Sequence, residues 1–315
     1  MVAANKTPNT LMGTIRYFDP ETTRAFVHSI KWPEGPCCPE CGSVNVGYIK
    51  SRDRHQCREK GCRKQFSLTT GTIMEATHLR LDQWVVAVWM IVNCRNGVSS
   101  CEIARTIGCK QQSAWHLLHR VRHILAQAPE GKLTGTIEAD STWVGGVVKY
   151  MPKRRRVAFL NKGPSFGKAT VHAIRDRATG TVRAQVIEKE TRAATEQVIG
   201  ENVAHGSRVF TDGSSVYSWL GAAGYSHESV NHTAGEYARG EVYTNGCENY
   251  FNCLRRAFKG TYIKPTPGHL QLYVDEATFR FNVRDLTEWE RFERAMREIV
   301  GKRLTYSDLT GGATR

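Results

Sequence analysis

Residues 136–144 read Thr-Ile-Glu-Ala-Asp-Ser-Thr-Trp-Val, and this stretch decides the fold of the second half of the chain. Its β-branched residues and its alternation of apolar and acidic positions predict a β-strand. Because side chains alternate across a strand, Glu138 and Asp140 should share one face while Ile137 and Ala139 occupy the other. We therefore expect a strand that presents two carboxylates on the same side of a sheet.

The segments after this strand alternate between strand and helix patterns, which is typical of a mixed α/β domain. A turn at 177–180 predicts a hairpin between the second and third strands. The predicted strands cover 169–175, 181–188, 208–211 and 227–230, and the predicted helices cover 191–203, 214–220 and 246–258. Three strands, helix, strand, helix, strand, helix is the element order of the ribonuclease-H-like fold. The expected fold class is therefore α/β, with a mixed sheet flanked by helices.

Two further acids stand where they could join Asp140. Asp212 ends a short apolar strand, and Glu248 lies in a helix with Arg255 two turns further along the same face. Converging carboxylates suit Mg²⁺ or Mn²⁺, and two such ions activate an attacking oxygen and stabilise a leaving oxygen in phosphodiester displacement. Taken singly, Asp212 could be a turn residue and Glu248 a solvated helix residue. The combination predicts a two-metal site.

A cluster of cysteines precedes these domains. Cys38 and Cys41 are separated by two residues, Cys57 and Cys62 by four, and fifteen residues lie between the two pairs. Two such pairs converge on one tetrahedral Zn²⁺, which replaces the hydrophobic core that about 40 residues cannot build. The four cysteines therefore predict a structural zinc ribbon, with Cys37 as an alternative to Cys38 and His55 as an alternative ligand.

The segment between the ribbon and the α/β region is helical in pattern. A buried helix is expected over 81–92, a short helix capped by Ser99 and Ser100 over 101–107, and a second helix over 111–125 after a glycine turn. The side chains expected on the outside of that second helix are Gln111, Gln112, Ser113, His116, His119, Arg120 and Arg122. Amides read adenine and cations hold phosphate in a major groove, which favours a helix-turn-helix DNA-binding domain. An ordinary helical hairpin is the alternative.

The chain carries 44 Lys and Arg against 30 Asp and Glu in 315 residues, a net charge of +14. This excess favours nucleic acid as partner, with improved solubility as the alternative. The basic run expected to clamp DNA is Lys153, Arg154, Arg155 and Arg156. The sequence lacks both an apolar run of roughly 18 residues and a secretion signal, so we expect no membrane association and a cytoplasmic location. Trp89, Trp115 and Trp143 are expected in the core.

Five motifs occur together in the second half of the chain: Ile137-Glu-Ala-Asp-Ser-Thr-Trp-Val-Gly-Gly146, Phe210-Thr-Asp-Gly213, Val230-Asn-His232, Tyr243-Thr-Asn-Gly-Cys-Glu248 and Leu254-Arg-Arg-Ala-Phe-Lys-Gly-Thr-Tyr262. This set resembles the insertion-sequence transposases of the ISXO type (family fifteen-ninety-five). The family's zinc ribbon is similar to residues 38–67, and its helix-turn-helix is similar to residues 99–122. The resemblance implies cut-and-paste or copy-type DNA transposition by a metal-dependent Asp-Asp-Glu/Asn core holding two Mg²⁺ or Mn²⁺ ions.

The resemblance also implies a role for individual residues. Asp140 takes the first catalytic position and Asp212 the second. The third is Glu248 or Asn245, and we favour Glu248 because a carboxylate binds a dication more strongly than an amide does.

The resemblance implies that basic residues near the core hold phosphates. Arg255 stands where many relatives have lysine; it keeps the charge and can bridge phosphates bidentately, and Lys259 follows it. The chain departs from the family pattern at Ser141, where relatives have an acid, and in the four residues between Cys57 and Cys62, where relatives have two.

The predicted domains are an N-terminal extension (1–29), a zinc ribbon (30–72), a helix-turn-helix domain (73–130), a ribonuclease-H-like core (131–290) and a C-terminal tail (291–315). The predicted function is a DNA transposase that binds the terminal inverted repeats of its element and joins them to target DNA. Because two ends must be joined, we expect a homo-oligomer on double-stranded DNA, at the nucleoid of a prokaryotic host. The alternatives are a catalytically silent DNA-binding regulator and a structure-specific nuclease on the same core.

Overall fold

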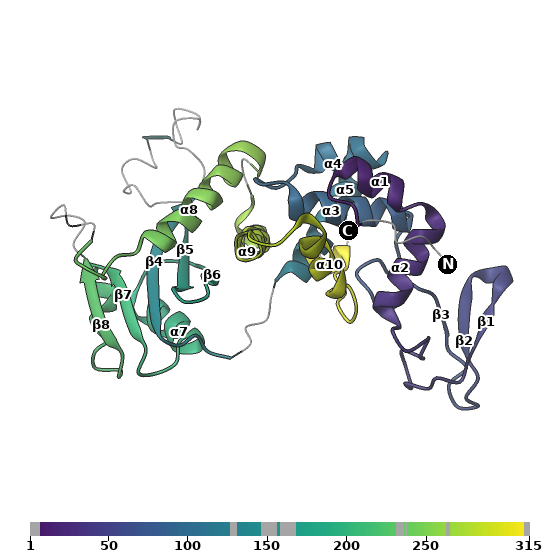
Figure 1. Cartoon of the computed structure of the whole chain (residues 1–315), viewed down its shortest axis with the longest axis horizontal. Helices are drawn as coiled ribbons and strands as arrows, with labels where there is room; N and C mark the ends of the chain where they lie inside the picture. Colours follow the sequence, from purple (N-terminus) through teal and green to yellow (C-terminus); the bar gives the residue numbers. More distant parts are fainter. Residues whose placement is uncertain are drawn as a thin grey trace. The chain divides into compact units, whose positions relative to one another are not determined.

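The structure, a computed structural model, describes residues 7–126, 131–145, 156–157, 168–230, 236, 238–262 and 265–311. Contacts divide the chain into two compact units. The first unit is Met1–Leu125 together with Asp285–Arg315, and the second is Ala126–Arg284. Figure 1 shows the helices and strands of both units.

The ribbon in the first unit is an antiparallel sheet in the order β1-β2-β3. Its strands are β1 (Val46–Ile49), β2 (Arg54–Cys57) and β3 (Gln65–Phe66), and η1 (Lys50–Arg52) turns the chain between the first two. Val46 pairs with Cys57, and His55 with Phe66. A sheet this small buries little apolar surface, so it needs an additional source of stability.

Three helices of the first unit occupy the segments predicted to be helical. They are α3 (Leu81–Asn93), α4 (Ser100–Ile107) and α5 (Gln111–Leu125). The Ser99 hydroxyl caps α4 by accepting a hydrogen bond of 3.1 Å from the Glu102 amide. Gly108 ends α4 in the left-handed conformation, with φ of 68°, which only glycine adopts readily. The chain then re-enters a helix at Gln111.

The two ends of the described chain pack together in the first unit. Their helices are α1 (Leu11–Tyr17), α2 (Pro20–Lys31), α10 (Glu288–Arg297) and α11 (Tyr306–Thr310). The ring of Phe292 lies 5.6 Å from those of Phe18 and Phe26, and 5.5 Å from those of Trp89 and Trp289, measured between centroids. The residues from Asp285 onward therefore help to build the core of the first unit.

The second unit contains a five-stranded mixed sheet in the order β6-β5-β4-β7-β8. Its strands are β4 (Thr136–Val144), β5 (Ala169–Asp176), β6 (Val182–Ile187), β7 (Arg208–Asp212) and β8 (Ser226–Val230). The first three strands are antiparallel neighbours, and β7 and β8 run parallel to β4. This order and these directions confirm the predicted ribonuclease-H-like fold class.

Helices cover both faces of this sheet. They are α7 (Arg192–Asn202), η3 (Ser215–Tyr217), α8 (Asn245–Ala257), the π-helical turn η5 (Phe258–Tyr262), η6 (Pro267–His269) and α9 (Leu270–Asn282). One apolar core joins Ile137 and Ala139 to α7 and η3, and a second joins Val171 and Ala173 to α8 and α9. Figure 1 shows α8 lying along the sheet. Because alternate strand residues face opposite ways, the two cores lie on opposite faces.

One predicted helix is much shorter than expected. The sequence predicts a helix over 214–220, but the structure has only the 3₁₀ turn η3 there, followed by further turns. Gly221 comes directly after the predicted helix, and Gly224 has a φ of 81°. The chain therefore turns toward β8 and does not continue a helix.

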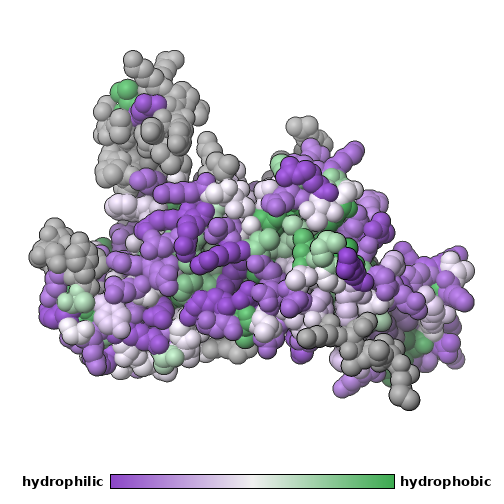
Figure 2. All heavy atoms as spheres, turned by 45° about the horizontal axis from the view of Figure 1, so that its top comes forward, coloured by the Kyte–Doolittle hydropathy of each residue, from purple (hydrophilic) through white to green (hydrophobic). Residues whose placement is uncertain are grey.

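The side chains on one face of the molecule are mainly polar (Figure 2). Hydrophilic residues, drawn in purple, make up most of the face shown in Figure 2. The strongly exposed large apolar side chains are scattered over both units, at Met12, Val44, Trp143 and Tyr306 among others. None of the described helices combines the length and the apolarity that a membrane span requires.

Candidate functional site

Asp140 lies on β4, and Asp212 ends β7, the parallel strand next to it. The two strands pair from Thr136 with Arg208 to Glu138 with Phe210, so Asp140 and Asp212 each lie two residues beyond the last pair. Both side chains are half-buried. The Asp140 carboxylate accepts a hydrogen bond of 2.7 Å from the Ser141 amide, and Asp212 accepts one of 3.3 Å from the Ser214 amide. Both acids therefore lie at the same end of two neighbouring parallel strands.

The Asp140 carboxyl lies in a negative environment. Burial is the main reason why its pKa is raised to about 7, and the Ser141 amide opposes this shift. The charges of Asp212, Glu190 and Glu248 raise the pKa further toward that value. A divalent cation would neutralise such mutual repulsion, so the charge pattern fits a cation site.

The third predicted position lies on α8. Glu248 is exposed in the first turn of this helix, and Asn245, also exposed, lies one turn before it. Two turns after Glu248, the Arg255 guanidinium donates a hydrogen bond of 2.7 Å to the Thr142 hydroxyl on β4. Thr142 is two residues beyond Asp140 and shares its face of the strand. The predicted helix face therefore lies against the predicted strand face.

The carboxylates are nevertheless not drawn into one tight cluster. Among the described residues, the four cysteines form a group of side chains close enough together to hold a metal ion. Asp140, Asp212 and Glu248 do not form such a group. The charges of Asp212 and Glu248 act on Asp140, but the three carboxylates do not form a closed set of ligands.

The four cysteines meet the geometry of a zinc site. Cys38, Cys41, Cys57 and Cys62 have sulfur atoms that all lie within 4.8 Å of one another. Two of the Sγ–Sγ distances, Cys38 to Cys62 and Cys41 to Cys57, are 3.6 Å. A tetrahedral Zn²⁺ at about 2.3 Å from each sulfur separates the sulfurs by about 3.8 Å. The donor set and its spacing therefore fit a structural Zn²⁺.

The two cysteine loops differ in their turns. Gly42 takes φ of 73° in the first loop, a left-handed conformation that glycine adopts readily. In the second loop the left-handed position falls on Arg63, with φ of 54°. Burial would raise the pKa of the Cys38 thiol, but the amides of Cys41 and Glu40 outweigh it and lower this pKa to about 7. These amides favour the thiolate that a metal requires.

Neither alternative ligand belongs to the sulfur cluster. Cys37 is exposed and lies outside the group. The ring of His55 stacks on Phe66 at 5.5 Å and meets Trp32 edge-on at 5.0 Å, so it serves the small apolar core of the ribbon.

The first turn of α5 carries the exposed amides expected there. Gln111, Gln112 and Ser113 are exposed, and His116 is half-buried. The Gln111 amide also donates a hydrogen bond of 2.7 Å to the Ser100 hydroxyl on α4.

Further along α5 the predicted exposure of His119, Arg120 and Arg122 is wrong, since each is at most 5% exposed. Arg120 donates to the backbone carbonyls of Leu304, at 2.9 Å, and Glu75, at 2.7 Å. The physical reason is that the residues after Asp285 return to cover this face of α5, which a local pattern does not reveal.

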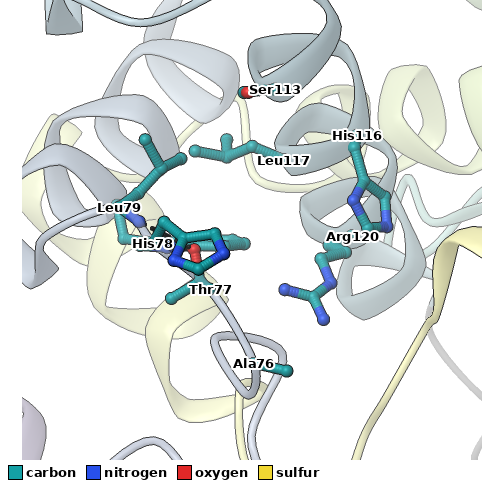
Figure 3. Close-up of a pocket in the computed structure, with 9 residues that line it drawn as sticks. Ala76, Thr77, His78, Leu79, Ser113, His116, Leu117 and Arg120 are labelled. Atoms are coloured by element: carbon teal, nitrogen blue, oxygen red, sulfur yellow. Dashed lines mark hydrogen bonds between the residues drawn. The ribbon is translucent and has the colours of Figure 1, made fainter.

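A pocket of about 150 Å³ lies beside this part of α5. Its lining consists of Ala76, Thr77, His78, Leu79, Trp84, Ser113, His116, Leu117 and Arg120. In Figure 3, Thr77 and His78 lie across the pocket from His116 and Arg120. The lining contains no carboxylate, so the pocket is unrelated to the predicted metal centre.

The remaining basic candidates are only partly described. Lys153, Arg154 and Arg155 lie outside the described residues, while Arg156 is half-buried. Arg255 and Lys259 are exposed.

One acid that acts on Asp140 was not identified from the sequence. Glu190, between β6 and α7, accepts a hydrogen bond of 3.1 Å from the Tyr217 hydroxyl and acts electrostatically on Asp140. It stands in no motif, so only the fold reveals it. Trp143, expected in the core, is instead 50% exposed, and the Lys168 amine lies 5.8 Å from the centroid of its ring.

A sheet in this strand order, with acids on its adjacent central strands, defines a ribonuclease-H-like protein that also carries a cysteine ribbon. Residues 132–282 match the ISXO2-like transposase domain, and residues 19–65 match the transposase zinc-ribbon domain. The chain belongs to the ISXO2-like insertion-sequence transposases.

The chain is also similar to a protein of a transposable element and to one solved structure. The chain is 25% identical over 237 residues to a protein of Halobacterium salinarum described as "Uncharacterized protein in transposable element ISH50", covering 72% of this chain and 79% of that protein. Among solved structures, it matches a chain of the simian T-cell lymphotropic virus intasome in complex with the PP2A regulatory subunit B56 gamma. That match has a TM-score of 0.30 and 14% identity, over 65% of this chain and 74% of the other.

Proposed function

We propose that this chain is an active DNA transposase that binds the terminal inverted repeats of its element and catalyses metal-dependent cleavage and strand transfer. One observation carries the proposal: Asp140 and Asp212 lie at the same end of neighbouring parallel strands, and the charges of Asp212 and Glu248 both act on Asp140. Acids that share a site without pairing to cations are typical of metal-dependent centres.

In this proposal Asp140, Asp212 and Glu248 hold two Mg²⁺ or Mn²⁺ ions, with Asn245 as the alternative to Glu248. Such ions, when bound, activate the attacking oxygen and stabilise the leaving oxygen of a phosphodiester. Arg255 then places its charge beside the acids and holds the DNA phosphate. Its contact with Thr142 supports this role, because it keeps the guanidinium near the strand of Asp140.

The first unit supplies recognition of double-stranded DNA. The exposed Gln111, Gln112 and Ser113 at the start of α5 suit base reading in a major groove, with α4 and α5 acting as a helix-turn-helix. His116 of this unit, and Lys259 and the run 153–156 of the second unit, add phosphate contacts. Arg120 is a weaker candidate because its guanidinium is used on backbone carbonyls.

The proposed transposition reaction requires more than one copy of the chain. Joining both ends of an element to target DNA requires two active sites, so we propose a homo-oligomer on DNA at the nucleoid of a prokaryotic cell. We also propose that the ribbon of residues 30–72, the helical domain of 73–130 and the core of 131–290 act as separate functional modules.

The test uses the full chain with a DNA fragment that carries the ends of its own element and the flanking DNA. We expect Mg²⁺-dependent cleavage at the ends and joining to a second DNA. Asp140→Asn should abolish both while it leaves DNA binding intact. Binding without cleavage by the wild-type chain favours a regulator, cleavage without joining favours a nuclease, and cleavage that persists in Asp140→Asn overturns the proposed site.

A further inference from the structure

Glu138 is fully buried in β4, and both of its carboxylate oxygens are hydrogen-bonded. Oε1 accepts from Arg175 Nη1 at 3.2 Å and from Arg177 Nε at 2.8 Å. Oε2 accepts from the backbone N–H of Cys247 at 3.1 Å. A buried carboxylate needs such partners because an uncompensated interior charge is strongly destabilising.

The Cys247 amide belongs to the first turn of α8, where backbone N–H groups have no partner inside the helix. Thr244, the residue before the helix, does not cap it, and its buried hydroxyl makes no hydrogen bond. Glu138 supplies the cap from a strand 109 residues earlier in the chain. Its negative charge also suits the positive end of the helix dipole.

Gly246 shows how closely this network is packed. A Cβ at this position would lie 2.2 Å from Arg175 Nη1 and 2.6 Å from Arg175 Cδ. The clash reaches the stem of the arginine as well as its tip, so a small movement of the guanidinium would not relieve it. Glycine is therefore required for Arg175 to reach Glu138 past the start of α8.

Arg177 extends the same network to the segment that leads into the helix. Its Nη1 and Nη2 donate to the carbonyls of Glu241 and Tyr243, both at 2.6 Å. Its guanidinium also lies 3.7 Å from the centroid of the Tyr243 ring. One buried carboxylate and two arginines thus fix both the entry and the first turn of α8.

We propose that Glu138 is a positioning residue that sets Glu248 opposite Asp140 by holding the first turn of α8 on β4. Glu138 is two residues before Asp140 on the same strand face, and the amide it binds is directly followed by Glu248. This inference rests on the proposed metal-dependent function. It assigns to Glu138 no contact with DNA or metal.

The test measures Mn²⁺ affinity of the full chain by electron paramagnetic resonance, together with the metal dependence of DNA cleavage. Glu138→Gln keeps the size of the side chain but removes its charge. We expect its Mn²⁺ dissociation constant, and the Mn²⁺ concentration for half-maximal cleavage, to rise about 10- to 100-fold, with cleavage recovering at saturating Mn²⁺. The matched control is Glu196→Gln, which removes an exposed ion pair with Arg192 on α7 and should change neither value.

A second variant guards against a folding defect in the first. Gly246→Ala displaces Arg175 from the other side of the network and should weaken Mn²⁺ binding in the same direction. If Glu138→Gln does not fold, as judged by circular dichroism, Gly246→Ala decides the question. Because the two changes act on one network, their combined effect should be smaller than the product of the single effects.

The outcomes separate this inference from the proposed function. Suppose that folded Glu138→Gln and Gly246→Ala bind Mn²⁺ with wild-type affinity and that Asp140→Asn abolishes binding. This result overturns the positioning role but leaves the proposed metal centre intact. Cleavage lost in Glu138→Gln without any loss of Mn²⁺ affinity also overturns it. Mn²⁺ binding that survives in Asp140→Asn refutes the proposed metal centre, and the positioning role with it.

Discussion

Burial determines what individual ionisable side chains do in this chain. His172 is fully buried on β5, 2.9 Å from the Ser141 hydroxyl, and burial lowers the pKa of its imidazole to about 4. His172 is therefore neutral near physiological pH and contacts Ser141, the residue after Asp140, without adding a positive charge there. Arg120 is also buried but satisfies its guanidinium with two backbone carbonyls.

Asp275 on α9 makes the stability of the second unit depend on pH. Burial raises its pKa to about 6, against a hydrogen bond from Gln271, so the folded chain binds this proton more tightly than the unfolded chain. Stability should fall as the pH rises from about 4 to about 6, by at most about 3 kcal/mol. Asp275→Asn should therefore unfold at a higher temperature than the wild type at pH 7, with little difference at pH 4.

The control for Asp275→Asn is Glu201→Gln, which changes an exposed acid in the same unit. Thermal unfolding followed by circular dichroism between pH 4 and pH 7 measures both variants. Equal midpoints for Asp275→Asn and the wild type at pH 7 would show that this carboxyl titrates normally.

At the scale of single elements, local signals are sufficient to predict most bounds. Thr191 caps α7 and Gly108 closes α4, as their residue types indicate, and α5 spans the predicted residues 111–125. The expectations that were wrong concern which side chains of an element are buried by the rest of the chain. Trp143 is exposed and Arg120 is buried because burial depends on chain segments far away in the sequence.

The ribbon should depend on its metal. Cys41→Ser removes one sulfur of the four-cysteine group, so we expect zinc content to fall well below one ion per chain and amides of β1 and β2 to lose protection from hydrogen exchange. The matched control is Cys37→Ser, whose sulfur lies outside the group and which should retain zinc. Zinc retained by Cys41→Ser with full protection, or lost in Cys37→Ser, would contradict this ligand assignment.

At the scale of the whole molecule, the most important feature absent from the sequence prediction is the return of the C-terminal segment. Residues expected to form a tail build the core of the first unit, where Phe292 is fully buried among aromatic rings from both ends of the chain. No local pattern pairs Phe292 with Phe18 or Trp89, because that contact joins segments about 200 to 270 residues apart. Asp140, Asp212 and Glu248 each stand in a recognisable motif, so a local pattern is enough to identify them as candidates.

Phe292→Ala should destabilise the first unit by about 3–5 kcal/mol, since it leaves a cavity among these rings. The second unit should unfold as in the wild type. Differential scanning calorimetry of the full chain measures both transitions. Met12→Ala, at a 58% exposed position of the same unit, is the control and should shift stability by less than about 0.5 kcal/mol. An unchanged first-unit transition in Phe292→Ala would show that the C-terminal segment does not support this core.

The central claim is that Asp140, Asp212 and Glu248 bind divalent cations together. Anomalous diffraction from a crystal of the full chain soaked in Mn²⁺ tests it most directly. We predict two Mn²⁺ peaks about 3.5–4 Å apart, with the carboxylate oxygens of Asp140 and Asp212 among their ligands. Well-ordered Asp140 and Asp212 side chains with no Mn²⁺ between them would contradict the claim.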